Sequence, residues 1–414
     1  MKVVIINTHD LDGGAARAAY RLHRGLLSFD IDSQMLVQIK TGGDFKVIGP
    51  SSLKSKLYAK VRPFLDKLTL RKYSNKTQAL FSRGVTGDRS LISKINALEP
   101  DIVHLHWINE GFLSVNDISA IKAPIVWSLH DMWPFTGGCH YDEWCGAYET
   151  GCGTCKVLSS QNVNDISRKM IRYKKLAYDN SNITVIGLSH WLAREASKSL
   201  VFKGKKIVNL PNPIDPKEFG LVNKTFAREL FNLPLDKKLI LFGAMRATGA
   251  QRKGFTQLAQ ALLKLDVNFD IVVFGAELPE EPDEFIQKCH YMGTLKDNAS
   301  LKALYNAADV MVVPSLQENL SNAIMESLVC GTPVAAFDIG GNGDMIKHQQ
   351  NGYLAKPFCS EDLAYGIDWL IKHFNSEASL QSISEKALNS YSTNNVIPQY
   401  IQLYQSIMEI KKRE

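Results

Sequence analysis

Long apolar runs and an export signal are both missing from the 414-residue sequence. No stretch of about 18 consecutive apolar residues occurs, so no membrane-spanning helix is expected. The apolar run in the N-terminal MKVVIINTHD is too short for a signal peptide and predicts a first strand instead. Without an export signal we expect a reducing compartment, in which the seven cysteines do not form disulfides. The expected location is the cytoplasm, either free or peripheral on the inner face of the membrane.

An excess of charge of one sign is also missing. The formal net charge is only +6 over the whole length, and charged residues make up an ordinary 22%. This balance permits an acidic ligand or an anionic membrane surface, but it does not call for nucleic acid, and we expect no nucleic-acid partner.

Short β-branched runs alternate with longer stretches of helical period, which predicts parallel sheets with right-handed crossovers. The length favours two domains of roughly 200 residues. The predicted fold class is α/β, with two doubly wound domains that bind ligands outside the carboxyl ends of their strands. Eleven strands are expected, at residues 2–8, 33–39, 101–107, 124–130, 183–189, 206–212, 238–244, 269–275, 289–295, 309–315 and 332–338.

Three prolines in LPNPIDPKEF, residues 210–219, break any regular element and suit a stiff connection between domains. We therefore predict an N-terminal domain over residues 1–210 and a C-terminal domain over 211–385. The remaining segment, 386–414, is predicted to be helical, and the sequence leaves open whether it returns to the first domain.

Two glutamates stand eight positions apart in SLQENLSNAIMESLVCGTPV, with no other charge between them. Glu318 precedes a helical pattern, whose predicted N-terminal cap is Ser321 or Asn319, and Glu326 lies within it. The free N–H groups at the start of a helix favour an anion such as phosphate. Carboxylates accept hydrogen bonds from sugar hydroxyls. Both glutamates can thus serve one ligand, although solvated surface positions are the alternative.

The run from Asp309 to Asp344 resembles the retaining nucleotide-sugar glycosyltransferases of the GT-B fold, in their large fourth family (group 1). That family carries two glutamates separated by seven residues. The resemblance implies two Rossmann-like domains facing a central cleft, with the acceptor on the N-terminal side and the donor on the C-terminal side. It also implies that Glu318 faces the hexose and Glu326 the ribose, and that backbone amides come from Asn319, Leu320 and Ser321.

The same resemblance assigns further donor-binding residues. Gly13 and Gly14 open a helix after the first strand, without the G-x-G-x-x-G spacing of a dinucleotide site. In FGAMRATGAQRKGF the family's arginine is replaced by Ala244, so the diphosphate charge would be met by three other residues, Arg246, Arg252 and Lys253. The nucleobase is expected to meet backbone near Gly275 and Leu295.

His130 ends a first-domain strand in WSLHDMWPF, and the resemblance places it beside the reacting sugar. The predicted reaction is retaining transfer of a hexose from a UDP- or GDP-sugar to a saccharide or lipid-linked acceptor, as in bacterial polysaccharide synthesis. No cofactor is expected, because the D-x-D at Asp30–Asp32 precedes a strand where a turn role is favoured. The alternatives are a nucleotide-sugar epimerase or phosphorylase of the same fold, an inactive sugar-nucleotide sensor, and a zinc-containing nucleic-acid binder.

Four cysteines gather within one glycine-rich loop. A tetrahedral zinc site is one interpretation, and free thiols or redox disulfides are the others. The predicted ligands are Cys139, Cys145, Cys152 and Cys155.

Residues 52–76 contain eight basic residues and one acid, with apolar residues at near-helical spacing. This pattern predicts either an interfacial helix on anionic lipid or a cleft-lining helix with a solvated basic face.

Overall fold

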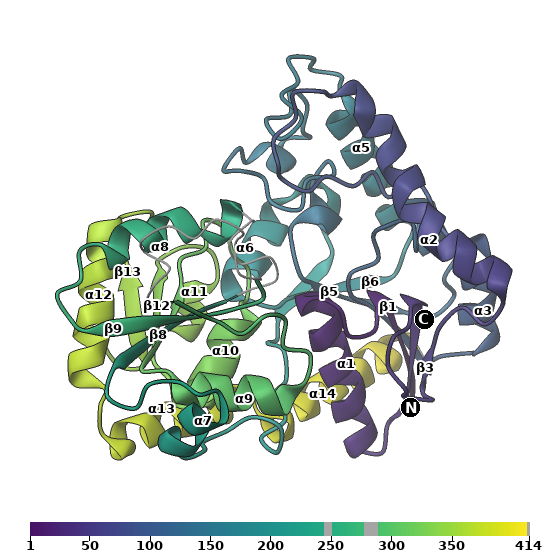
Figure 1. Ribbon diagram of the computed structural model, residues 1–414. Helices are drawn as coiled ribbons and strands as arrows, with labels where there is room; N and C mark the ends of the chain where they lie inside the picture. The colour runs from purple at the N-terminus through teal and green to yellow at the C-terminus, as the bar shows by residue number, and fades with distance from the viewer. Residues whose placement is uncertain (244–250, 277–288, 412–414) are drawn as a thin grey trace. The chain divides into compact units, whose positions relative to one another are not determined.

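The computed structural model describes residues 1–243, 251–276 and 289–411, and they pack as two compact units (Figure 1). Unit 1 contains Met1–Asn212 together with the chain from Val396 onward, and unit 2 contains Pro213–Asn395. The sequence placed these two boundaries after residues 210 and 385. Each unit is described by itself below.

Unit 1 is built on a seven-stranded sheet of order β3-β2-β1-β4-β5-β6-β7, in which every pairing is parallel. The central strands are apolar on both sides because helices cover both faces. The strands are β1 (Lys2–His9), β2 (Asp32–Ile39), β3 (Val47–Ile48), β4 (Ile102–Leu105), β5 (Ile125–Leu129), β6 (Ile183–Gly187) and β7 (Lys206–Asn209).

Apart from the last helix of the chain, the helices of unit 1 lie in the connections between its strands, as parallel pairing requires. The α-helices are α1 (Gly14–Ser28), α2 (Leu53–Leu68), α3 (Arg89–Ala97), α4 (Val115–Ile118), α5 (Ile166–Asp179), α6 (His190–Lys198) and α14 (Thr393–Lys411). Short 3₁₀ turns are η1 (Thr69–Lys72), η2 (Trp133–Phe135), η3 (Ala147–Glu149) and η4 (Leu200–Phe202). The last helix is held in this unit by a bond between the Tyr404 hydroxyl and His104 Nδ1, at 2.6 Å.

Unit 2 is built on a six-stranded parallel sheet of order β10-β9-β8-β11-β12-β13. Its strands are β8 (Lys238–Gly243), β9 (Phe269–Phe274), β10 (Cys289–Tyr291), β11 (Val310–Val313), β12 (Val334–Phe337) and β13 (Gly352–Ala355). Its helices are α7 (Lys224–Leu230), η5 (Gln251–Lys253), α8 (Phe255–Leu262), α9 (Asn298–Ala307), α10 (Asn322–Val329), α11 (Asn342–Met345), α12 (Ser360–His373) and α13 (Glu377–Tyr391).

The two faces of this second sheet carry separate apolar cores, and β8 shows why. Its side chains alternate between faces with period two. Leu239 and Leu241 pack into the core that contains α10, whereas Ile240 and Phe242 pack into the core that contains α8 and α12. Unit 2 is therefore doubly wound, with helices on both faces.

All eleven predicted strands are present, and the structure adds β3 and β13. Among the described helices, none combines the length and the apolar character needed to cross a membrane.

Candidate functional site

The carboxyl ends of four adjacent strands gather the predicted residues of unit 2 at one edge of its sheet. Gly275 follows β9, and its N–H donates to the Gly293 carbonyl just beyond β10, at 2.7 Å. Leu295 lies further along this segment, packed against the core. Glu318 follows β11, in the loop that leads to α10. Neighbouring parallel strands end at the same edge, which explains this grouping.

Glu318 is buried and makes a charged cluster with residues of η5. Its Oε2 accepts from Lys253 Nζ at 2.7 Å and from Arg252 Nη1 at 3.5 Å. The Ser315 hydroxyl donates to the same oxygen at 3.2 Å. Burial raises the pKa of Glu318, but Lys253, Arg252 and these hydrogen bonds outweigh it and lower the pKa to about 2. Burial lowers the pKa of Lys253, and Glu318 opposes that effect.

Two glycines allow the loop around Glu318 to pack against its neighbours. Gly254 has φ 73°, and a Cβ there would lie 1.8 Å from the Pro314 carbonyl oxygen. Gly340 has φ 53°, and a Cβ there would lie 1.9 Å from the carbonyl oxygen of Glu318. A residue with a side chain would clash with these carbonyl oxygens at either position. Gly254 thus allows close packing at Pro314, where the loop begins, and Gly340 allows it at Glu318 itself.

Glu326 is buried within α10, where its Oε2 accepts from the Tyr305 hydroxyl at 2.9 Å. Ser321 occupies the N-cap position of α10, as one of the two predicted caps, but its side chain makes no capping hydrogen bond. Asn319 and Leu320 lie in the turn before it. Backbone N–H groups at the start of a helix point outward along its axis and favour an anion there.

The remaining donor-binding predictions fall in three places. Arg252 and Lys253 lie at the Glu318 cluster. Arg246 lies outside the described residues. In unit 1, Gly13 is the N-cap of α1 and Gly14 is its first residue, and Gly13 supplies no side-chain cap.

His130 follows β5 in unit 1 and is joined to a histidine that the sequence interpretation missed. His106 follows the adjacent strand β4, and its Nδ1 lies 2.8 Å from Nε2 of His130. Burial lowers the pKa of His130 to about 4 and that of His106 well below its ordinary value. The pair is therefore uncharged near neutral pH. His104 Nε2 makes a similar contact with the Ser128 hydroxyl at 2.9 Å.

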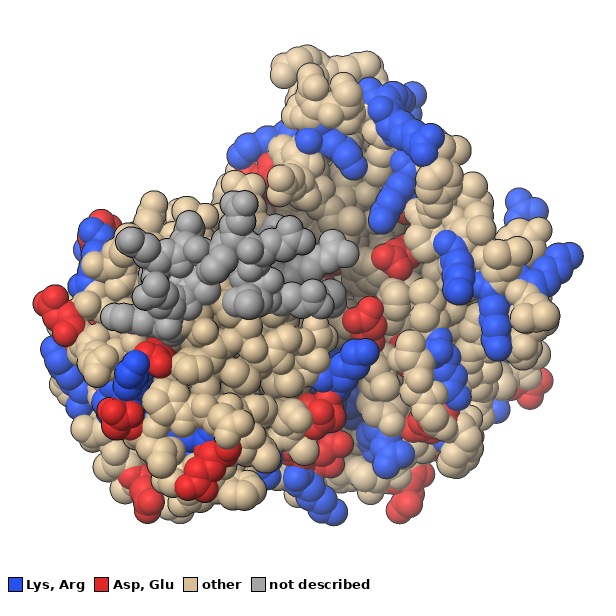
Figure 2. Space-filling view, in the orientation of Figure 1, with Lys and Arg blue, Asp and Glu red and all other residues tan. Residues whose placement is uncertain are grey.

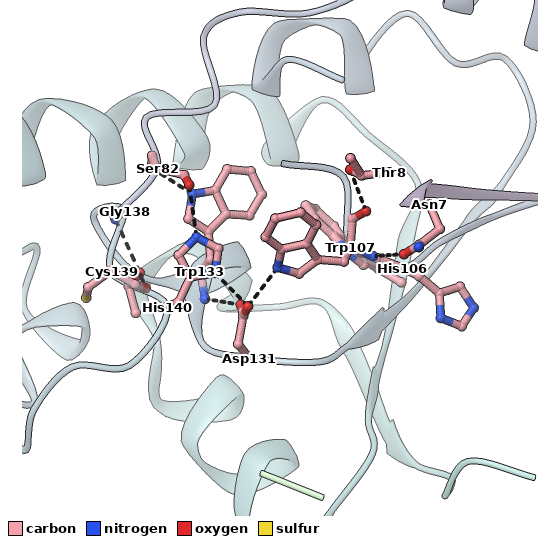
Figure 3. A network of polar contacts seen from close by, with 12 residues as sticks. Asn7, Thr8, Ser82, His106, Trp107, Asp131, Trp133, Gly138, Cys139 and His140 are labelled. Carbon is pink, nitrogen blue, oxygen red and sulfur yellow. Dashed lines mark hydrogen bonds and ion pairs between the residues drawn. The ribbon is translucent and has the colours of Figure 1, made fainter. Parts of the chain in front are cut away.

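Asp131, the residue after His130, anchors the same end of the sheet (Figure 3). Its Oδ2 accepts from His140 Nδ1 at 2.6 Å and from Trp107 Nε1 at 3.0 Å, and its Oδ1 accepts from the Trp133 N–H at 2.9 Å. Burial raises the pKa of Asp131, but His140 and these hydrogen bonds lower it overall. A signal for His106 and Trp107 was present in DIVHLHW, since these residues end the strand beside the one that ends at His130.

The four-cysteine loop does not form a metal-binding arrangement. All four thiols are free, and no three His, Cys, Asp or Glu side chains of the described residues are placed to hold a metal ion. Burial raises the pKa of Cys152 to about 12 and that of Cys155 to about 11, so both are neutral thiols. Burial also raises the pKa of Cys139 and of Cys145. No zinc site is therefore assigned among the described residues, and zinc binding stays a prediction that metal analysis of the purified protein would test.

Both halves of the chain match known families. Residues 12–218 match the family described as Glycosyltransferase Family 4, and residues 236–373 match the family described as Glycosyl transferases group 1. The putative colanic acid biosynthesis glycosyl transferase WcaC of Escherichia coli (strain K12) is 23% identical over 429 residues, which cover 98% of this chain and 100% of WcaC. An uncharacterised glycosyltransferase of Methanocaldococcus jannaschii is 25% identical over 326 residues, or 76% of this chain and 77% of that protein.

The solved structure of Anabaena HepE in complex with UDP shares the fold. Its TM-score is 0.65 with 15% sequence identity, and the match covers 98% of this chain and 100% of HepE. This likeness confirms the predicted GT-B fold, and the low identity restricts it to the fold.

Proposed function

The chain belongs to the family 4, group 1 glycosyltransferases, and we propose that it transfers a hexose with retained configuration from a UDP- or GDP-sugar. The acceptor is a hydroxyl group of a saccharide or of a lipid-linked saccharide, in the assembly of a polysaccharide. The observation that carries the proposal is the charged cluster of Glu318 with Lys253 and Arg252, in the loop that leads to the start of α10.

The cluster suits a donor with a diphosphate. Lys253 and Arg252 place positive charge where the phosphates would lie, and N–H groups at the start of α10 add donors. The desolvated Lys253 ammonium would gain a second anionic partner on donor binding. The ionised Glu318 would accept hydrogen bonds from hexose hydroxyls, and Glu326 from the ribose hydroxyls.

In the reaction, the bond between the anomeric carbon and the diphosphate breaks, and the acceptor oxygen forms a new bond on the same face of the sugar. The acceptor proton passes to the leaving diphosphate, so no protein nucleophile and no metal ion are required. His130, uncharged near neutral pH, would position the donor sugar through a hydrogen bond.

The names of relatives support the pathway class and one of the two nucleotides. WcaC is named for colanic acid biosynthesis, and HepE was solved with UDP and with UDP-glucose. A donor carrying UDP is thus the first to test. A zinc-containing nucleic-acid binder loses its basis, because both halves of the chain match glycosyltransferase families.

Calorimetric titration of the full chain with UDP, GDP, ADP and TDP tests the donor site. Glu326→Gln is the informative variant, because its amide oxygen can still accept from the Tyr305 hydroxyl and so keeps the buried contact. Glu229→Gln, an exposed glutamate of α7 in the same unit, is the matched control. We expect one nucleotide to bind selectively, and Glu326→Gln alone to weaken it by about tenfold or more.

Failure of all four nucleotides to bind the parent protein would overturn the transferase proposal. With the selected sugar nucleotide and an acceptor, NMR of the product reports the anomeric configuration, and inversion would refute the retaining mechanism. Activity abolished by EDTA would refute metal independence. Net interconversion of sugar nucleotides without an acceptor would favour the epimerase alternative.

A further inference from the structure

Helix α2 exposes the apolar side chains that an ordinary surface helix would bury. Leu53, Leu57, Val61, Phe64 and Leu68 follow at i, i+4, i+8, i+11 and i+15, a spacing that places them along one face. The exposed fraction of these side chains runs from 39% for Val61 to 87% for Leu53. In Figure 1 the helix lies along the outer edge of unit 1.

The opposite face of α2, which contacts the rest of unit 1, is unusually polar. Ala59 and Asp66 are the buried residues of the helix. Arg62, on the same face, pairs with Asp88 at 2.9 Å and approaches Gln38 Oε1 at 3.4 Å. Polar contacts therefore hold the helix against unit 1. The five apolar side chains from Leu53 to Leu68 form a stripe that is exposed on the surface. A contiguous exposed stripe of this kind usually marks a contact with a partner or a membrane.

Basic residues flank the stripe, with few acids to balance them. Lys54, Lys56, Lys60 and Lys67 are all exposed on α2, whereas its one acid, Asp66, is buried. Arg71, in the following turn, lies over the ring of Phe64 at 5.1 Å from its centroid. Figure 2 shows Lys and Arg side chains gathered on the part of the surface that α2 occupies in Figure 1.

A cavity of about 520 Å³ at the carboxyl end of α2 extends this basic surface. Its lining includes Leu68 from the stripe, and also Lys72, Arg83 and Lys169, with Asp165 as the one acid. A cavity of this volume has room for a lipid headgroup. Its three cations and one carboxylate favour a headgroup that is anionic.

We propose that α2 docks the protein on an anionic lipid bilayer, with the stripe from Leu53 to Leu68 in the headgroup–acyl boundary and the flanking lysines on lipid phosphates. An amphipathic helix that lies in the membrane plane combines the same two elements, apolar burial and attraction to anionic headgroups. This proposal goes beyond the glycosyl transfer and does not depend on it.

A second copy of the chain fits the surface less well. A two-fold contact through α2 would bring the same lysine-rich face against itself. Like charges facing each other disfavour such a dimer, whereas an anionic bilayer complements them. Charge complementarity therefore selects the bilayer.

Co-sedimentation of the full chain with vesicles tests the docking surface. Vesicles of phosphatidylcholine alone are compared with vesicles that also contain phosphatidylglycerol. Leu57→Ser/Phe64→Ser removes two members of the exposed stripe, and both substitutions lie on the surface, so the fold is retained. Phe226→Ser/Leu263→Ser is the matched control, because these exposed side chains lie in unit 2 at 59% and 78% exposure.

We expect binding to the anionic vesicles only, weakened about tenfold or more by Leu57→Ser/Phe64→Ser and unchanged in the control. Lys56→Glu/Lys60→Glu/Lys67→Glu should abolish the preference for anionic lipid. Absence of binding to either vesicle, or equal binding by the stripe variant and its parent, would overturn the proposal. A concentration-dependent dimer that the stripe variant loses, without vesicle binding, would assign the face to a second copy. Nucleotide titration of the same variants is independent of these results, so the two proposals can fail separately.

Discussion

His106 and His130 share a hydrogen bond of 2.8 Å between Nδ1 and Nε2 at the ends of two adjacent parallel strands. Nε2 of His106 is buried without a hydrogen-bond partner in the described structure. An unpaired acceptor is less costly to bury than an unpaired N–H, which places the His106 proton on Nδ1. His106 then donates to His130 and leaves it with its own proton on Nδ1. His106 is thereby a positioning residue for His130.

We expect His106→Phe to lower kcat for glycosyl transfer by about 10- to 100-fold, because the His130 ring loses the bond that orients it. The Kd of the nucleotide should not change, since His106 does not belong to the nucleotide cluster of unit 2. His106→Asn is the rescue variant, because its amide nitrogen can occupy the place of Nδ1. Steady-state kinetics and calorimetry measure the two quantities, and a Phe variant with the kcat of its parent would remove the positioning role.

Lys253 and Glu318 should be energetically coupled, because they form a buried ion pair at 2.7 Å. Lys253→Met leaves the Glu318 carboxylate with less positive charge beside it. We therefore expect the free energy of unfolding to decrease by about 2 kcal/mol. Adding Glu318→Gln should recover part of that loss, with a coupling of about 1 to 3 kcal/mol in a double-mutant cycle.

Urea unfolding of the four proteins, followed by circular dichroism, gives this coupling. Lys217→Met, at an exposed lysine of unit 2, controls for the loss of a lysine as such. Strictly additive effects of the two substitutions would contradict the coupling.

Gly340 should not tolerate a side chain, because a Cβ would lie 1.9 Å from the Glu318 carbonyl oxygen and φ is 53°. We expect Gly340→Ala to destabilise the protein by about 2 kcal/mol and to weaken nucleotide binding by moving Glu318. Gly343→Ala is the matched control, since the nearest atom to its Cβ would be 3.5 Å away. Thermal unfolding measures the stability of the two variants, and calorimetry measures their nucleotide binding. An equal Tm and an equal Kd for both variants would show that the loop accommodates a side chain at position 340.

The strands and the Glu318 loop could be predicted because their signals are local. A β-branched run such as residues 310–313 marks a buried strand wherever it lies in the chain. β3 was missed because it has two residues, and β13 because it begins with Gly352 and lacks a β-branched run. His106 was missed because its contact depends on the register between β4 and β5, which no local pattern contains.

For α2 the sequence pattern predicted the helix correctly, but it did not predict which face of the helix is buried. The periodicity of residues 53–68 predicts an amphipathic helix, but periodicity does not say which face turns toward the protein. Polar contacts determine which face is buried. One of them is the ion pair of Arg62 with Asp88, two residues that lie far apart in sequence.

The buried histidines make unit 1 sensitive to acid. Burial lowers the pKa of His23 to about 4 and that of His104 to about 3, whereas an unfolded histidine titrates near 6.5. Between pH 6.5 and 4 the unfolded chain therefore binds more protons than the folded chain, and stability falls as the pH falls. For His23 alone the loss between pH 7 and pH 5 is about 2 kcal/mol. His9 opposes this trend slightly, because Glu110 raises its pKa.

His23→Leu should reduce this pH dependence, because the variant has no proton to bind at that position on unfolding. We expect its apparent Tm to fall less between pH 7 and pH 5 than that of the parent, even though the variant is less stable at pH 7 through the loss of the bond between His23 Nδ1 and Ser33 Oγ. Ile5→Val, a buried change in the same unit without a titrating group, controls for general destabilisation. Circular dichroism melts at the two pH values give the difference, and an equal fall in Tm for His23→Leu and Ile5→Val would exclude His23 as a source of the acid sensitivity.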